Sequence, residues 1–216
     1  MNILYILLGW FLGILSPGIT TKISNHYKKA ALQRTIISEM KDIKIRLAGI
    51  PMTIHPAYGT LDMSLFKWVQ EQTQNFTDFI SDDNDAAKLE AADLENDDKI
   101  AKVIEAWNYK KKSDNPSFHF KKMDTSIADS NLINIEILDN NFIKKLLEIK
   151  FQIRAFNEEV QSVNEYSIMT FDSNMSGANH QIIQREIKQK NYFISKKAIY
   201  IVEKINSLVE FKKSRS

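Results

Sequence analysis

Histidines are the first residues to consider for chemistry, because imidazole both carries protons and binds metals. The chain has His26, His55, His119 and His180, each standing singly, and no H-E-x-x-H pair. A metal site would need them to converge from distant segments. The aspartates within 82–85 lack the glycine and the closing glutamate of an EF-hand calcium loop. We therefore expect no metal site.

Local motifs of other catalytic and cofactor-binding classes are also missing from the sequence. There is no G-x-x-x-x-G-K-[ST] phosphate loop, no G-x-G-x-x-G and no G-x-S-x-G elbow. The chain has no cysteine, which excludes disulfides, thiolate metal sites and a cysteine nucleophile. We therefore expect no cofactor and no catalytic residue. An enzyme stays as an alternative, because a site assembled from distant helices leaves no local pattern.

The composition is that of a folded protein with an uneven charge. The 216 residues include 29 Lys and Arg against 27 Asp and Glu, and 44% are hydrophobic. Residues 1–50 carry seven basic and two acidic residues, whereas residues 51–98 carry two basic and eleven acidic residues. The simplest role of the acidic segment 82–98 is solubility and pairing with basic helices. A surface that docks a partner is the alternative.

Lysines on the last predicted helix raise the question of nucleic acid. Lys190, Lys197 and Lys204 repeat every seven residues and share one helical face. However, glutamates interleave with them, arginine is scarce and no nucleic-acid-binding motif is present. We interpret this surface as a solvated face and do not expect nucleic acid as a partner.

An uncharged N-terminal segment predicts where the protein is located. Residues 2–21 carry no charged side chain, and the apolar run from Ile3 to Ile19 is 17 residues long. That is the short end of what spans a bilayer core of about 30 Å. A cleaved signal peptide is one alternative, although the start Met1-Asn2 is not basic. A buried core helix is another. We favour a single transmembrane anchor over residues 1–21.

Basic residues that follow this run predict its orientation. They form a membrane-surface cluster of Lys22, Lys28, Lys29 and Arg34. Positive flanks stay in the cytoplasm, so we expect a single-pass protein of the inner (plasma) membrane. The N-terminus would lie outside and the C-terminal domain would be cytoplasmic. The lipid bilayer is then a predicted partner, with about 1 kcal/mol from each basic residue near the surface.

Small residues inside the run offer a packing face between spans. Gly9, Gly13 and Ser16 are spaced so that two helices could approach closely in lipid. This spacing predicts a homo-oligomer. Chance is a serious rival explanation, because glycine is common in membrane helices.

Heptad spacing predicts long helices in the rest of the chain. We expect helices over 20–49, 141–166 and 178–212, the first stopped by Gly49 and Pro51. The 4-3 spacing of a coiled-coil seam recurs in each. In the first it runs Ile36, Met40, Ile43, Leu47, Ile50; in the second Phe142, Leu146, Ile149, Ile153, Phe156, Val160, Val163; in the third Ile187, Asn191, Ile194, Ala198, Ile201, Ile205, Leu208. Asn191 is the polar seam position, and such a residue can fix register at a cost in stability.

Shorter segments complete the expected fold. Helices over 61–80 and from Asn96 to about Tyr109 form a hairpin inserted at 61–109. The sequence over 132–138, LINIEIL, fits a strand or a helical turn, and we favour the turn. We expect an all-α fold: a single transmembrane helix followed by an elongated antiparallel helical bundle over 22–216.

The function that this layout favours is binding. We expect a membrane-anchored scaffold, sensor or adaptor with an unknown protein partner. The first alternative is a defence or toxin effector that oligomerises through its span, and the second is the enzyme already mentioned. The general layout resembles that of many small bacterial membrane-anchored proteins, a resemblance that carries over no functional residue.

Overall fold

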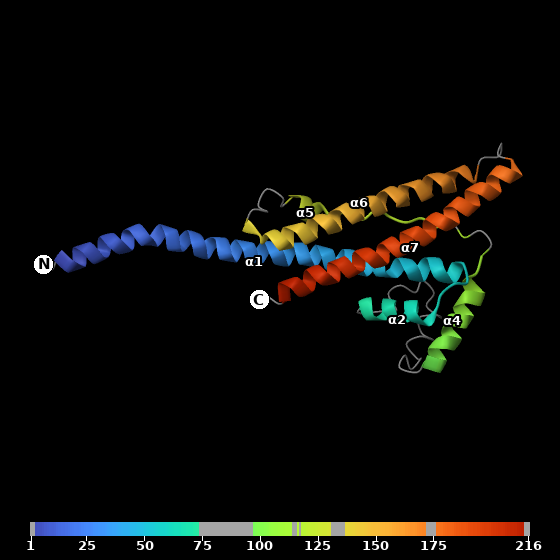
Figure 1. The fold of residues 1–216 in the computed structure, drawn as a ribbon, viewed down its shortest axis with the longest axis horizontal. Helices are drawn as coiled ribbons and strands as arrows, with labels where there is room; N and C mark the ends of the chain where they lie inside the picture. Colours follow the sequence, from blue (N-terminus) through green and yellow to red (C-terminus); the bar gives the residue numbers. More distant parts are fainter. Residues whose placement is uncertain are drawn as a thin grey trace.

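The computed structural model shows a chain built from helices (Figure 1). It describes residues 3–73, 97–113, 116, 118–130, 137–171 and 176–213, except the side chains of 3–9 and 11–21. The helices in these ranges are α1 (Ile3–Ala57), α2 (Met63–Gln72), α4 (Asp97–Lys111), α5 (Ser126–Ser130), α6 (Asn140–Met169) and α7 (Gly177–Lys213). No strand occurs within these ranges, and the predicted all-helical class is confirmed.

Three long helices form the elongated bundle. α7 packs on both α1 and α6, and it runs antiparallel to each of them (Figure 1). Its 37 residues correspond to about 55 Å of helix at 1.5 Å per residue. The core is the predicted set of seams: all seven seam residues of α6 and all seven of α7 are buried, as are the five of α1. The 4-3 spacing in the sequence therefore correctly predicts which residues of the three helices are buried.

The first bundle helix continues past its predicted end. Gly49 and Pro51 do not stop α1, which runs on to Ala57. Pro51 has no N–H to donate, so the helix loses one backbone hydrogen bond there. Burial of the next turn offsets that loss, because Ile54 is fully buried and Met52 is nearly so. The chain turns only at Gly59, whose positive φ of 68° is a backbone conformation that glycine adopts readily.

The predicted hairpin is present in part, on the C-terminal third of α1 (Figure 1). Asp62 caps α2 by accepting a hydrogen bond from the Leu65 N–H at 2.8 Å. α2 ends earlier than predicted, because the backbone is extended at Thr73. α4 confirms the predicted helix from 96 to 109. Phe66 and Trp107 pack together in a second, smaller core.

Two predicted segments lie outside the described residues. These are residues 74–96, which hold the end of the predicted helix over 61–80 and most of the acidic segment 82–98, and residues 131–136, which hold most of LINIEIL.

The predicted single-pass location at the inner membrane is wrong. Among the residues whose side chains the structure describes, no helix combines the length and apolar character that a membrane crossing needs. From Lys22 onward, α1 carries charged side chains in most of its turns. Charged side chains inside hydrocarbon are costly. The predicted orientation, with the N-terminus outside and the C-terminal domain cytoplasmic, depended on this location and is wrong with it.

The small residues assigned to packing between spans receive no support. Gly9, Gly13 and Ser16 belong to the stretch of α1 whose side chains are outside the described residues. The alternative of an effector that oligomerises through its span depends on these same residues.

Candidate functional site

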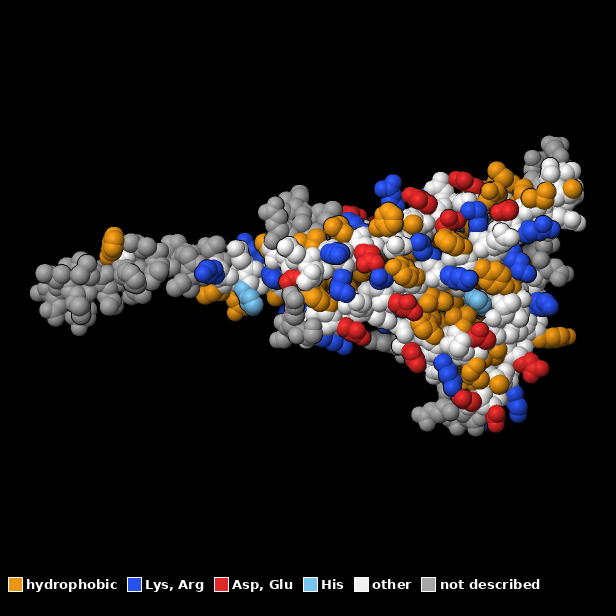
Figure 2. Space-filling view, in the orientation of Figure 1, with side chains coloured by type: hydrophobic (Ala, Val, Ile, Leu, Met, Phe, Trp, Pro, Cys, Tyr) orange, Lys and Arg blue, Asp and Glu red, His pale blue; other side chains and the backbone are white. Residues whose placement is uncertain are grey.

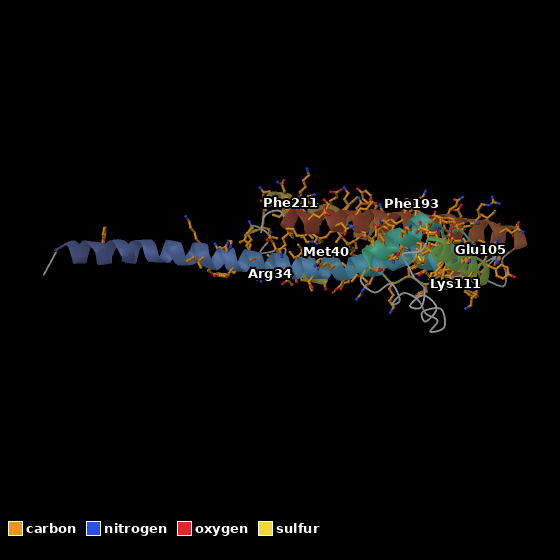
Figure 3. All side chains as sticks on the ribbon, turned by 90° about the horizontal axis from the view of Figure 1, so that it is seen from below. Arg34, Met40, Glu105, Lys111, Phe193 and Phe211 are labelled. Atoms are coloured by element: carbon orange, nitrogen blue, oxygen red, sulfur yellow. The ribbon has the colours of Figure 1, made fainter. Side chains whose placement is uncertain are left out.

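The N-terminal part of α1 projects from the bundle as a single helix (Figures 1 and 3). Among side chains that the structure describes, Ile36 is the first buried residue of α1. We call residues 22–35, which precede it, the arm. The arm contains all four residues of the predicted basic cluster: Lys22, Lys28 and Arg34 are exposed, and Lys29 is half-buried.

Apolar side chains share the arm with these cations. Ile23 is 52% exposed and Tyr27 is 70% exposed. They are four residues apart, so they lie one above the other on one face of the helix. Ala30 and Arg34 continue that row with 4-3-4 spacing. The arm therefore presents an apolar stripe that ends on a guanidinium group and is flanked by lysines.

A cavity of about 570 Å³ lies where the arm meets the bundle. We call it the junction cavity. His26, Lys29 and Arg34 line it from the arm, Asp139 lines it from the start of α6, and Phe211 and Lys212 line it from the end of α7. Figure 3 labels Arg34 and Phe211, which mark this end of the bundle.

The junction cavity gathers part of the predicted cluster. Lys29 and Arg34 come together there, whereas Lys22 and Lys28 are not among its described lining residues. Lys212 was missed, because 178 residues separate it from Arg34 and no local pattern links them.

Electrostatics at the junction favour an anionic group. Burial lowers the pKa of the Lys212 ammonium, and the positive charges of Arg34 and Lys41 lower it further. Asp139 is the one carboxylate among the described lining residues. An added carboxylate or phosphate would therefore relieve repulsion between cations here.

A serine–histidine pair lies at the other end of α1. His55 Nε2 is 3.1 Å from Ser195 Oγ, and His55 Nδ1 lies 3.3 Å from the Thr60 carbonyl oxygen. This is the hydrogen-bonded chain of a nucleophile, a base and an orienting group. However, Ser195 is fully buried, so a substrate carbon cannot approach its hydroxyl. The pair therefore ties α1 to α7.

The His55 imidazole predicts a pH dependence of stability. Burial lowers the pKa of His55, against smaller opposing effects of the Thr60 carbonyl and the Asp62 carboxylate. The unfolded chain therefore binds more protons than the folded chain as pH falls through the ordinary histidine value of about 6.5. The contribution of neutral His55 is complete above that pH and is lost as pH falls below it.

We expect His55→Gln to flatten the decline in unfolding free energy between about pH 7.5 and about pH 5.5. Urea denaturation at a series of pH values measures this. His119→Gln, at an exposed histidine, is the matched control and keeps the wild-type decline. Identical slopes for wild type and His55→Gln would contradict the assignment.

Asn191 lies where the seam pattern places it, fully buried in α7. Its Nδ2 donates to the Tyr58 hydroxyl at 3.0 Å, whereas its Oδ1 has no hydrogen-bond partner among the described residues. A buried acceptor without a partner costs about 1–3 kcal/mol. Its role in setting helix register stays a prediction.

Comparison with protein-family models, with curated proteins and with solved structures finds no match to this chain.

Proposed function

We propose that this chain acts by binding a protein partner, as an adaptor whose bundle is a rigid frame and whose arm is the docking element. The observation that carries this proposal is the exposure of Ile23 and Tyr27 on a helix that projects from the bundle. Ile23 and Tyr27 are exposed, whereas packing of an apolar face supplies most of the stability of a helix in a protein. An apolar stripe on such a helix is stabilised when a partner covers it.

The charge of the arm indicates the charge that its partner should carry. The arm has four basic residues and no acidic residue. Two arms side by side would bring cations together, which disfavours a homo-oligomer formed through this element. An acidic helix with an apolar face would complement both the stripe and the lysines. The junction cavity supplies further positive charge at the base of the arm.

Photo-crosslinking in the native cell tests the proposal. A benzophenone amino acid replaces Tyr27 in one variant and Tyr109, which is 89% exposed on α4, in the control. We expect one protein product from position 27, acidic by its identified sequence, and no such product from position 109. No product at position 27, a product of this same chain, or equal products at both positions would overturn the proposal.

A further inference from the structure

A second cavity, of about 590 Å³, lies at the end of the bundle opposite to the arm. Its lining includes Tyr58 from the turn after α1, Ser167, Thr170 and Phe171 from the end of α6, and Arg185 and Lys188 from the first turns of α7. Small-molecule sites occupy about 300–1,000 Å³. We call this space the ring cavity. Figure 2 shows hydrophobic side chains (orange) beside basic ones (blue) at this end of α6 and α7.

Among the described residues that line the ring cavity there are two cations, Arg185 and Lys188, and no carboxylate. Arg185 and Lys188 are three residues apart on α7 and so share one face. No Asp or Glu is among the described residues that line the space. Neither cation forms an ion pair with another described residue, and Lys188 Nζ lies 5.3 Å from the centre of the Tyr58 ring. The described part of the lining thus carries two positive charges that a ligand could neutralise.

Aromatic rings supply the apolar part of the lining. The Phe171 ring is 83% exposed, so covering it removes apolar surface from water. The Tyr58 ring is half-buried and packs 5.3 Å from the Tyr192 ring. Because the Tyr58 hydroxyl accepts its hydrogen bond from Asn191 Nδ2, its own proton is available for donation.

We propose that the ring cavity binds a ligand of the mononucleotide class, in which a planar base stacks on an aromatic ring and a phosphate contacts Arg185 and Lys188. A phosphate monoester carries up to two negative charges near neutral pH, which matches the two cations. Guanidinium groups bind phosphate through two parallel hydrogen bonds. Bases stack on aromatic side chains regardless of their sequence. This site is separate from the arm and does not depend on the adaptor proposal.

Hydroxyl groups near the cations fit the same ligand. Ser167 and Thr170 line the cavity beside Phe171. Thr170 Oγ1 donates to the Ser167 carbonyl at 2.6 Å, which leaves the oxygen of that hydroxyl able to accept. A ribose presents hydroxyl groups of the kind that such side chains bind. A simple aromatic carboxylate has no ribose and brings a single charge, so it would satisfy less of this lining.

Titration calorimetry of the full chain tests the proposal with four probes: AMP, UMP, adenosine and inorganic phosphate. We expect both nucleotides to bind at least about tenfold more tightly than adenosine or phosphate, because only they use both halves of the site. Failure of both nucleotides to bind with a Kd below about 1 mM would overturn the proposal. If phosphate and the nucleotides bound with equal affinity, the proposed stacking of the base on an aromatic ring would be overturned.

Three variants distinguish binding at a specific site from nonspecific attraction of the nucleotide to positive charge. Arg185→Gln is expected to weaken AMP binding by about tenfold. Lys196→Gln removes one positive charge from an exposed position of α7 outside the described lining, so it is the matched control and leaves the affinity within about twofold. Phe171→Ala, at an exposed ring, lowers AMP affinity and leaves phosphate affinity unchanged. Equal losses in Arg185→Gln and Lys196→Gln would overturn the proposal.

Discussion

Replacing Phe156 with alanine lowers the free energy of unfolding by about 3–5 kcal/mol. Phe156 is fully buried in the α6 seam and belongs to the core cluster shared by α1, α6 and α7. The substitution removes buried apolar surface and leaves a cavity that rigid helices cannot close. Urea denaturation followed by circular dichroism measures the change.

The matched control is Phe151→Ala in the same helix. Phe151 is 68% exposed, so the same chemical change costs less than about 0.5 kcal/mol. Equal losses of stability in the two variants would contradict the seam as the core of the bundle.

Replacing Glu39 with alanine lowers the free energy of unfolding by about 2–4 kcal/mol. Glu39 is only 8% exposed, and its two carboxylate oxygens accept from the N–H groups of Ile127 at 2.8 Å and Ala128 at 2.9 Å. These N–H groups belong to the first turn of α5, which has only five residues. Glu39 therefore fastens this short helix to α1, and its removal leaves two donors without their acceptor.

Hydrogen exchange makes the Glu39 prediction specific. The Ala128 amide is expected to lose protection in Glu39→Ala and to keep part of it in Glu39→Gln, whose side chain retains one acceptor oxygen. Glu158→Ala removes an exposed glutamate of α6 that pairs with Arg154, and costs less than about 0.5 kcal/mol. Unchanged Ala128 exchange in Glu39→Ala would contradict the capping role.

The seams of the bundle could be predicted from the sequence because a repeat of apolar residues is a local property of each helix. Phe142 through Val163 in α6 shows the 4-3 spacing without interruption, and every one of those seam residues is buried. The ends of helices depend on distant contacts instead. Pro51 is a local stop for α1, yet the helix continues to Ala57, about two turns past the predicted end, and buries Ile54 there. α2 ends at Gln72 although apolar residues continue after it.

The candidate sites were predicted less well, for a related reason. Lys29 and Arg34 were identified as a basic cluster, but their sequence neighbours indicated lipid as the partner. The contact with the end of α7 that defines the junction cavity appears only when residues 178 positions apart are brought together. His55 and Ser195, 140 residues apart, share a hydrogen bond for which no local pattern exists. Tyr58 and Arg185, which are 127 positions apart, line one cavity and likewise share no local pattern.

A binding measurement with purified components is the most direct test of whether the arm docks an acidic protein, as proposed. The partner captured at position 27 is titrated into wild type, Lys28→Glu and Lys102→Glu at two salt concentrations. Both lysines are exposed on helices, and only Lys28 lies on the arm. We expect Lys28→Glu to weaken binding by about tenfold at low salt and by less at high salt, because salt screens exposed charges. Lys102→Glu should retain wild-type affinity. Equal affinity of Lys28→Glu and wild type would contradict the account.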